Sequence, residues 1–146
     1  MITESSIVID GQPADVWLIY VDVERWPDWT ASVTRVVALD GPAIEVGRRF
    51  EIKQPRLPTL VWEVTAVDPG SSWTWRQRSP GGTTFASHEL EAHDGGTLVR
   101  QRIDQRGPVG VLVGVLMRRL TRRYLALESA GLKARSEQHR QGASPA

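Results

Sequence analysis

The two histidines of the segment HELEAH, His88 and His93, are the residues whose type and spacing first suggest chemistry. The segment differs from the zinc-protease motif H-E-x-x-H, in which two histidines four positions apart share one face of a helix. His88 and His93 are five positions apart in a stretch that alternates like a strand, so their side chains point to opposite faces. A shared zinc ion is therefore not expected, and no metal site is predicted.

His88 is the residue of this chain best suited by type to transfer protons. Imidazole has an ordinary pKa close to neutrality, which suits a general acid or base. Strand alternation predicts that His88 points inward. The same face carries three tryptophans, Trp62, Trp73 and Trp75. The alternative is a core histidine hydrogen-bonded to Gln77 or Gln101, and a polar contact between His88 and a ligand is compatible with both interpretations.

Several kinds of chemistry lack their usual residues in this sequence. There is no cysteine, which excludes disulfides, iron–sulfur clusters, thiolate zinc sites and cysteine nucleophiles. There is also no G-x-S-x-G motif, no P-loop and no dinucleotide-binding glycine pattern. No cofactor is therefore predicted. The net charge of +1 provides no field that would gather nucleic acid, so no nucleic-acid partner is expected.

Tryptophan is unusually frequent in this chain. The 146 residues include six tryptophans but only two phenylalanines and two tyrosines. Tryptophan combines a wide apolar surface with one N–H donor, which suits the wall of a pocket as well as a core. Alternation on neighbouring strands places several aromatic residues on one face, where they form either part of a core or the wall of a ligand pocket. The predicted ligand contacts are Trp29, Phe50, Trp62, Trp73, Trp75, His88, Gln101, Leu116, Leu120 and Tyr124.

The elements that would position these residues follow from apolar runs and turn residues. A first strand is predicted at Ser5 to Asp10, followed by two short helical pieces that begin at Pro13 and are interrupted at Pro27. Clusters of Gly, Pro and Asp then recur about every ten residues, which is typical of an antiparallel meander. The predicted strands of this meander are Val33 to Leu39, Arg48 to Gln54, Leu60 to Asp68, Ser72 to Ser79, Thr83 to Ala92 and Thr97 to Gln105.

The same alternation predicts how individual strands are oriented. Trp62, Val64 and Ala66 are expected on the inner face of their strand. In the strand that contains His88, placing the imidazole inward leaves the apolar side chain of Phe85 on the outer face. An outward Phe85 is the less usual arrangement, so this strand is a direct test of the predicted orientation.

A long amphipathic helix is predicted from Val109 to about Glu137, because apolar residues recur at intervals of three and four. The GxxxG spacing of Gly110 and Gly114 indicates either a close approach to the sheet or a loose segment at a ligand gate. The opposite side of the helix is rich in arginine and is expected to be solvated, with at most transient contact with a membrane surface. The polar residues 138–146 are predicted to form a flexible tail.

The order of these elements predicts an α+β fold in one domain, residues 1–137. The chain length is close to that of one average domain. A sheet of about seven strands needs one face covered, and the terminal helix is the only element long enough to cover it. A curved sheet around a helix leaves a gap between them. The gap is either filled with side chains or left as a cavity.

Four segments of the chain resemble the polyketide cyclase/dehydrase and lipid-transport group of the START-like, Bet v 1-like helix-grip superfamily. They are PADVW at Pro13 to Trp17, DVERWPDW at Asp22 to Trp29, QPRLPTLVWEVTAVDPGSSWTW at Gln54 to Trp75, and SHELEAHDGGTLV at Ser87 to Val99. The resemblance extends from about Ser5 to Glu137. It implies a seven-stranded antiparallel sheet curved around the long helix, with a cavity for a hydrophobic ligand between them.

Three functions are compatible with this resemblance. The first is the binding of a small hydrophobic or amphipathic ligand, such as a lipid or a polyketide-like molecule, in a Trp-lined cavity. The second is a polyketide aromatase/cyclase or dehydratase that uses His88 as acid and base. The third is an interaction protein whose cavity is vestigial. The N-terminus resembles no signal peptide and no apolar stretch is long enough to span a membrane, so a cytoplasmic location is expected; the oligomeric state stays open.

Overall fold

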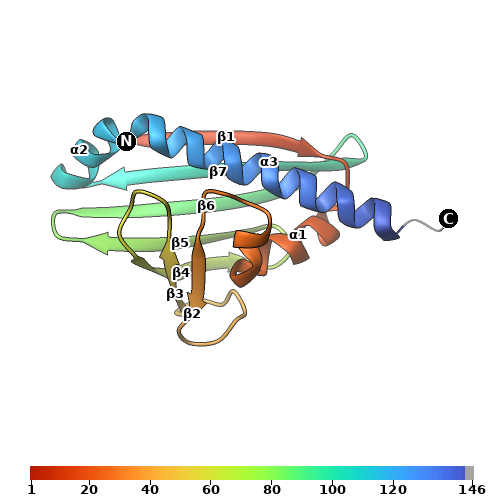
Figure 1. Cartoon of the computed structure of the whole chain (residues 1–146), viewed down its shortest axis with the longest axis horizontal. Helices are drawn as coiled ribbons and strands as arrows, with labels where there is room; N and C mark the ends of the chain where they lie inside the picture. The colour runs from red at the N-terminus through yellow and green to blue at the C-terminus, as the bar shows by residue number, and fades with distance from the viewer. Residues whose placement is uncertain (144–146) are drawn as a thin grey trace.

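The chain folds around one antiparallel sheet, described here by a computed structural model for residues 1–143. Within these residues seven strands lie in the order β1-β7-β6-β5-β4-β3-β2 (Figure 1). The strands are β1 (Ile2–Ile9), β2 (Arg35–Ala38), β3 (Arg49–Lys53), β4 (Leu60–Asp68), β5 (Ser72–Ser79), β6 (Gly82–His93) and β7 (Gly96–Arg106). The helices are α1 (Pro13–Val21), the short 3-10 helix η1 (Val23–Asp28), α2 (Pro108–Leu116) and α3 (Arg118–Ala143).

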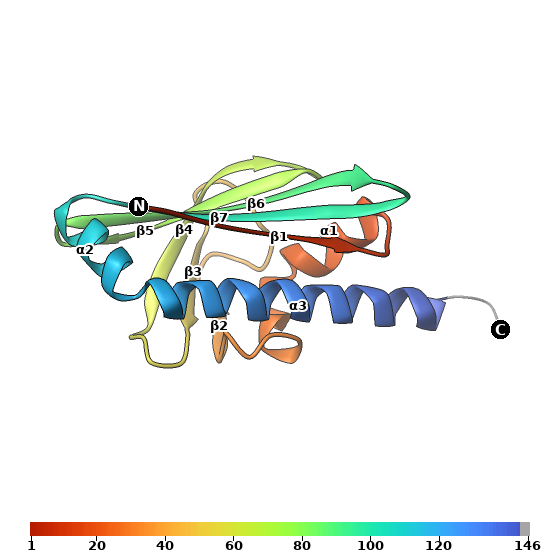
Figure 2. The same ribbon diagram turned by 90° about the horizontal axis from the view of Figure 1, so that it is seen from above.

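The longest helix, α3, covers one face of this sheet. Figure 2 shows α3 running along the sheet, with α1 and η1 on the same side. The helix packs against β1 and α1. The largest fully buried side chains between these layers include Tyr20, Phe50, Trp73 and Leu132. This arrangement confirms the predicted α+β helix-grip architecture.

A β-bulge in β4 corrects the predicted orientation of the end of that strand. The pairing with β5 shifts between Val64 and Ala66, so that Val64 faces Trp75 and Val67 faces Trp73. The extra residue reverses the alternation beyond it. Ala66 is exposed in consequence, while Val67 packs against the core.

The predicted orientation of β6 is confirmed. Ala86, His88 and Leu90 are buried, on the face that meets the helices. Phe85 lies on the outer face, where the guanidinium carbon of Arg106 is 4.6 Å from the centre of its ring. This cation–π contact partly covers the ring of Phe85, which strand alternation directs towards solvent.

The prediction of one continuous helix from Val109 is wrong, because the chain changes direction at Met117. The backbone of Met117 has φ −100° and ψ 11°, in the bridge region between helix and strand geometry. A Cβ atom on Gly114 would lie 2.5 Å from Oε1 of Gln105, and one on Gly82 of β6 would lie 2.7 Å from the backbone nitrogen of Gly110. Glycines therefore allow α2 to lie close to β6 and β7, which is one of the two interpretations of the GxxxG spacing, whereas α3 follows β1 (Figure 2).

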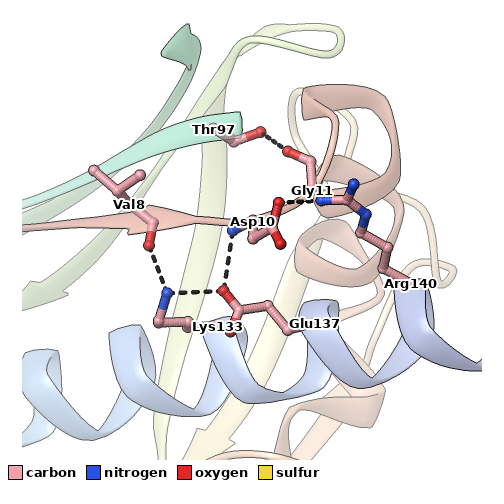
Figure 3. A network of polar contacts seen from close by, with 7 residues as sticks. All are labelled: Val8, Asp10, Gly11, Thr97, Lys133, Glu137 and Arg140. Carbon is pink, nitrogen blue, oxygen red and sulfur yellow. Dashed lines mark hydrogen bonds and ion pairs between the residues drawn. The ribbon is translucent and has the colours of Figure 1, made fainter. Parts of the chain in front are cut away.

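The end of α3 is tied to the connection between β1 and α1 (Figure 3). A carboxylate oxygen of Glu137 accepts hydrogen bonds from the backbone N–H of Asp10 at 3.0 Å and from Nζ of Lys133 at 2.7 Å. The same Nζ donates to the carbonyl oxygen of Val8 at 2.9 Å. Arg140 pairs with the carboxylate of Asp10. Charged groups on two turns of α3 therefore hold this end of the helix to the sheet.

Residues 138–143 of the predicted flexible tail are helical in the structure. α3 continues through these polar residues to Ala143. The contacts of its last turns with Asp10 provide the anchoring that a polar composition does not reveal. Residues 144–146 lie outside the described part of the chain.

Gly131 allows α3 to approach the segment after η1. A Cβ atom at this position would overlap the carbonyl oxygen of Trp29 and lie 3.0 Å from its carbonyl carbon. The obstacle is backbone, which cannot rotate away as a side chain can. The position of α3 over the sheet therefore depends on a glycine here.

We expect Gly131→Ala to destabilise the protein by about 1–3 kcal/mol, because α3 or the Trp29 backbone must move to accept the methyl group. The free energy of unfolding from urea denaturation measures this loss. Gly142→Ala is the matched control, since a Cβ atom at Gly142 meets no atom within 4 Å and alanine favours a helix. Equal stability of the two variants would contradict the close contact at Gly131.

Candidate ligand-binding site

A cavity of about 190 Å³ lies between the sheet and the C-terminal helices. Side chains from β4 to β7 form one wall, and α2 and α3 form the other. The loop between β3 and β4 contributes Gln54 and Leu57. The surface of the cavity is mainly apolar and includes Ile52, Leu60, Trp62, Trp75, Met117 and Leu120.

Trp75 lies at the centre of an aromatic wall. Its ring centre is 5.5 Å from that of Trp26, 5.9 Å from that of Trp62 and 6.0 Å from that of Phe50. The rings are tilted towards one another, an arrangement that aromatic quadrupoles favour over face-to-face stacking. Because each ring is packed against others, this wall is held in place without a ligand.

Glu128 of α3 brings a carboxyl group to the cavity. The hydroxyl of Tyr20 donates to Oε1 of Glu128 at 3.3 Å, and Nε2 of Gln101 donates to the hydroxyl oxygen of Tyr20 at 2.7 Å. Oγ of Ser129 donates to Oε1 of Gln101 at 2.8 Å. Polar groups from α1, β7 and α3 therefore form one connected cluster around a carboxyl group that faces apolar space.

Burial raises the pKa of Glu128 from its ordinary value of 4.5 to about 8. Hydrogen bonds with Tyr20 and Gln101 lower this pKa, but by less than burial raises it. The pKa of Tyr20 is itself raised well above 10, first by burial and then by the charge of Glu128. At neutral pH the carboxyl group of Glu128 is therefore mostly protonated and can donate a hydrogen bond or a proton to a molecule in the cavity.

His88 also lines the cavity but is held by a different partner from the two predicted ones. Its Nδ1 is 3.2 Å from the carbonyl oxygen of Trp73, and its ring stacks on that indole with the centres 4.0 Å apart. Burial lowers the pKa of His88 to about 3. The imidazole is therefore neutral at pH 7, and the near-neutral pKa that its type suggests is not what this environment produces.

Tyr124 uses its hydroxyl to join α3 to the loop between β3 and β4. The hydroxyl donates a hydrogen bond to the carbonyl oxygen of Pro55, next to Gln54 in the cavity wall. Nζ of Lys53 donates to the carbonyl oxygens of Gln54, at 2.9 Å, and Leu57. These bonds fix the position of the loop where Gln54 and Leu57 line the cavity.

Six of the ten predicted contact residues line the cavity: Trp62, Trp75, His88, Gln101, Leu120 and Tyr124. The structure brings them together from β4, β5, β6, β7 and α3. Alternation along the strands and the helical period of α3 are what put them on facing surfaces.

The other four predicted contacts, Trp29, Phe50, Trp73 and Leu116, do not line the cavity. Phe50 is fully buried beside Trp75, and Trp73 is covered by the ring of His88. Trp29 packs against α3 where Gly131 passes it. Leu116 is 73% exposed and lies on the side of α2 away from the buried Gly110 and Gly114.

Glu128 is the main site residue that the sequence predictions leave out, although a signal for it exists. It lies four positions after Tyr124 and four before the fully buried Leu132, so it belongs to the buried side of α3. A single carboxylate on such a stripe points to a functional group. Its partner Tyr20 comes from a distant part of the chain, and only folding joins the two.

A family model described as polyketide cyclase/dehydrase and lipid transport matches residues 2–137. Comparison with curated proteins finds no match. Among solved structures, norcoclaurine synthase from Thalictrum flavum has a TM-score of 0.76 at 10% identity, with 96% of each chain covered.

Two further solved structures have the same fold. The di-domain aromatase/cyclase StfQ of the steffimycin biosynthetic pathway has a TM-score of 0.75 at 15% identity, over 96% of this chain and 51% of that one. Major latex-like protein 151 from Panax ginseng has a TM-score of 0.68 at 15% identity, over 93% of this chain and 97% of that one. At these identities the likeness establishes the fold alone.

The raised pKa of Glu128 predicts how stability depends on pH. An unfolded chain loses this proton near pH 4.5, whereas the folded protein keeps it up to about pH 8, so this group stabilises the fold less and less as pH rises between these values. Glu128→Gln should therefore melt above the parent protein at pH 8, and the gap should narrow towards pH 5.

Differential scanning calorimetry of both proteins across this range measures the effect. The difference between the two proteins isolates Glu128, because the buried His88 acts equally in both. A gap that is constant with pH would contradict a raised pKa at Glu128.

Proposed function

Because this chain belongs to the polyketide cyclase/dehydrase and lipid-transport family, we propose that it binds one small, mainly apolar molecule that carries an oxygen group. The observation that supports this proposal is the carboxyl group of Glu128, which is hydrogen-bonded to Tyr20 and lines a cavity that also contains tryptophans; its raised pKa of about 8 favours the protonated form at neutral pH. The apolar part of the ligand packs against Trp62 and Trp75. Its oxygen accepts a hydrogen bond from Glu128.

The size of the cavity restricts the ligand. An apolar cavity of about 150 Å³ is enough to hold benzene, so 190 Å³ suits one substituted ring. A longer polyketide or a lipid chain requires the loop that Tyr124 holds, or α2, to move outwards. The proposed substrate class is therefore a compact ketone, phenol or alcohol.

Glu128 also selects for the charge of the ligand. A neutral carbonyl or hydroxyl oxygen is recognised by the protonated carboxyl group, which is present below about pH 8. A cationic amine pairs instead with the ionised carboxylate of Glu128, and its positive charge favours loss of the proton from that carboxyl group. The two kinds of ligand should therefore respond to pH in opposite directions.

Acetophenone, ethylbenzene and benzylamine provide matched probes of this site, differing in one polar group on a single ring. At pH 6 acetophenone should bind more tightly than ethylbenzene by about five- to tenfold, the contribution of one hydrogen bond. This advantage should disappear at pH 9.5, where Glu128 is ionised. Isothermal titration calorimetry, with quenching of tryptophan fluorescence as a second readout, measures each affinity.

Glu128→Gln is the control variant, because its amide N–H₂ donates at every pH. Acetophenone should keep its advantage in this variant at both pH values. Failure of all three probes to bind, or an acetophenone affinity that does not change with pH in the parent protein, would contradict the proposal.

Proton-transfer catalysis on a polyketide-like chain is the second candidate, and the pKa of Glu128 favours it. A pKa of about 8 is close to the range in which one group serves as both acid and base at neutral pH. In an aldol cyclisation, the carboxylate of Glu128 would take a proton from the methylene carbon between two carbonyl groups, and the carboxylic acid so formed would give that proton to the ketone oxygen as the new carbon–carbon bond forms. For this second candidate the sequence predicts His88 as acid and base, but its pKa of about 3 makes Glu128 the better candidate.

A short poly-β-keto thioester tests this second candidate, with cyclised product followed by chromatography. Glu128→Gln should lower turnover by about 10² or more, since general acid–base groups contribute on this scale. His88→Gln should lower the melting temperature, because it removes the stacking on Trp73, but should leave the pH profile of turnover unchanged. If the parent protein forms no product, or if His88→Gln and not Glu128→Gln moves the pH profile, Glu128 is not the catalytic group.

A further inference from the structure

The helix α2 exposes large apolar side chains that no described part of the chain covers. Leu112 is 57% exposed, Val115 59% and Leu116 73%. The buried side of this helix consists of Gly110 and Gly114. Exposed apolar residues are common singly, but several on one short helix mark an interaction surface.

Four exposed arginines lie on the first turns of α3, close to the end of α2: Arg118, Arg119, Arg122 and Arg123. Some arginines elsewhere on the surface are paired, as Arg49 is with Asp40 and Arg100 with Glu91. Within residues 1–143 no ion pair joins any of these four to an acidic side chain. Uncompensated positive charge therefore adjoins the exposed apolar helix.

We propose that α2 and the four arginines form a docking surface for an anionic lipid bilayer. Apolar side chains beside arginines match an interface in which acyl chains lie beneath anionic headgroups. No helix in the described part of the chain is long and apolar enough to cross a membrane. α2, with nine residues, is about 14 Å long and lies in the plane of the interface.

Charge favours a bilayer over a second copy of this chain. If two copies joined through α2, the arginines of one would face the arginines of the other in a symmetric contact. Like charges brought together in a desolvated interface oppose association. An anionic headgroup region compensates the same charges.

The docking surface adjoins the cavity. Val113 of α2, Met117 at the break and Leu120 of α3 all line it, so a movement of α2 at the break opens the cavity towards the bilayer. This step rests on the proposed ligand-binding function: an apolar ligand passes between the acyl region and the cavity beneath α2. Docking itself does not require a ligand.

Co-sedimentation with vesicles tests docking on the full chain without ligand. Vesicles of phosphatidylcholine mixed with phosphatidylglycerol should bind the protein, and phosphatidylcholine alone should bind it at least tenfold more weakly. Arg118→Gln and Arg119→Gln should each lower the affinity about fivefold, and high salt should lower it further. Arg25→Gln, at an exposed side chain of η1, is the matched control and should have no effect.

The apolar part of the surface has its own pair of variants. Leu116→Glu should reduce vesicle binding by more than tenfold, whereas Leu18→Glu on α1, where the side chain is 67% exposed, should not. The chain lacks cysteine, so Leu116→Cys and Leu18→Cys can each carry a single environment-sensitive fluorophore. Only the probe at position 116 should shift to the blue on anionic vesicles.

Docking and ligand binding can fail separately in these measurements. Loss of vesicle binding in Leu116→Glu with acetophenone affinity unchanged supports the docking surface. Equal binding to both vesicle types, or no binding to either, overturns it whatever the ligand results are. A dimer that light scattering detects and that Leu116→Glu dissociates would also overturn it, in favour of a second copy.

Discussion

The structure depends on one constraint: a single long helix, α3, has to cover the open face of a seven-stranded sheet. The helix is held close by the absence of a side chain at Gly131, where it passes the Trp29 backbone, and its end is tied down by Glu137 and Arg140. Once α3 is placed in this way, its inward side chains become the second wall of whatever space the sheet leaves. The cavity is therefore a result of how the helix is anchored rather than of the strands alone.

The same anchoring of α3 explains why the pKa of Glu128 is raised. α3 places its carboxyl group against Tyr20 and Gln101, away from bulk water, and burial then disfavours the charged form. A buried carboxyl group lowers stability at neutral pH compared with a neutral group of the same shape, which is a common property of functional sites. His88 is also neutral, because burial lowers its pKa to about 3, although its bond to the Trp73 carbonyl acts in the other direction.

The cavity has two unlike ends, and both are set by α3 and the helix before it. Met117 lies at the break with α2, and Glu128 lies eleven residues further along, about 16 Å away along the helix axis. One end is next to the exposed apolar helix α2, and the other holds the hydrogen-bonding carboxyl group of Glu128.

The sequence by itself determined the order of the elements, the antiparallel meander and the inward direction of Trp62, Trp75 and His88, because these depend on local turns and on a period of two. It did not reveal the bulge in β4, the break at Met117 or the pKa of Glu128. The bulge depends on the pairing of β4 with β5, the position of α2 on its close approach to β6 and β7, and the pKa of Glu128 on burial that arises only in the folded protein. Local patterns record which face a residue takes, but burial and its effect on charge arise only when those faces are brought together.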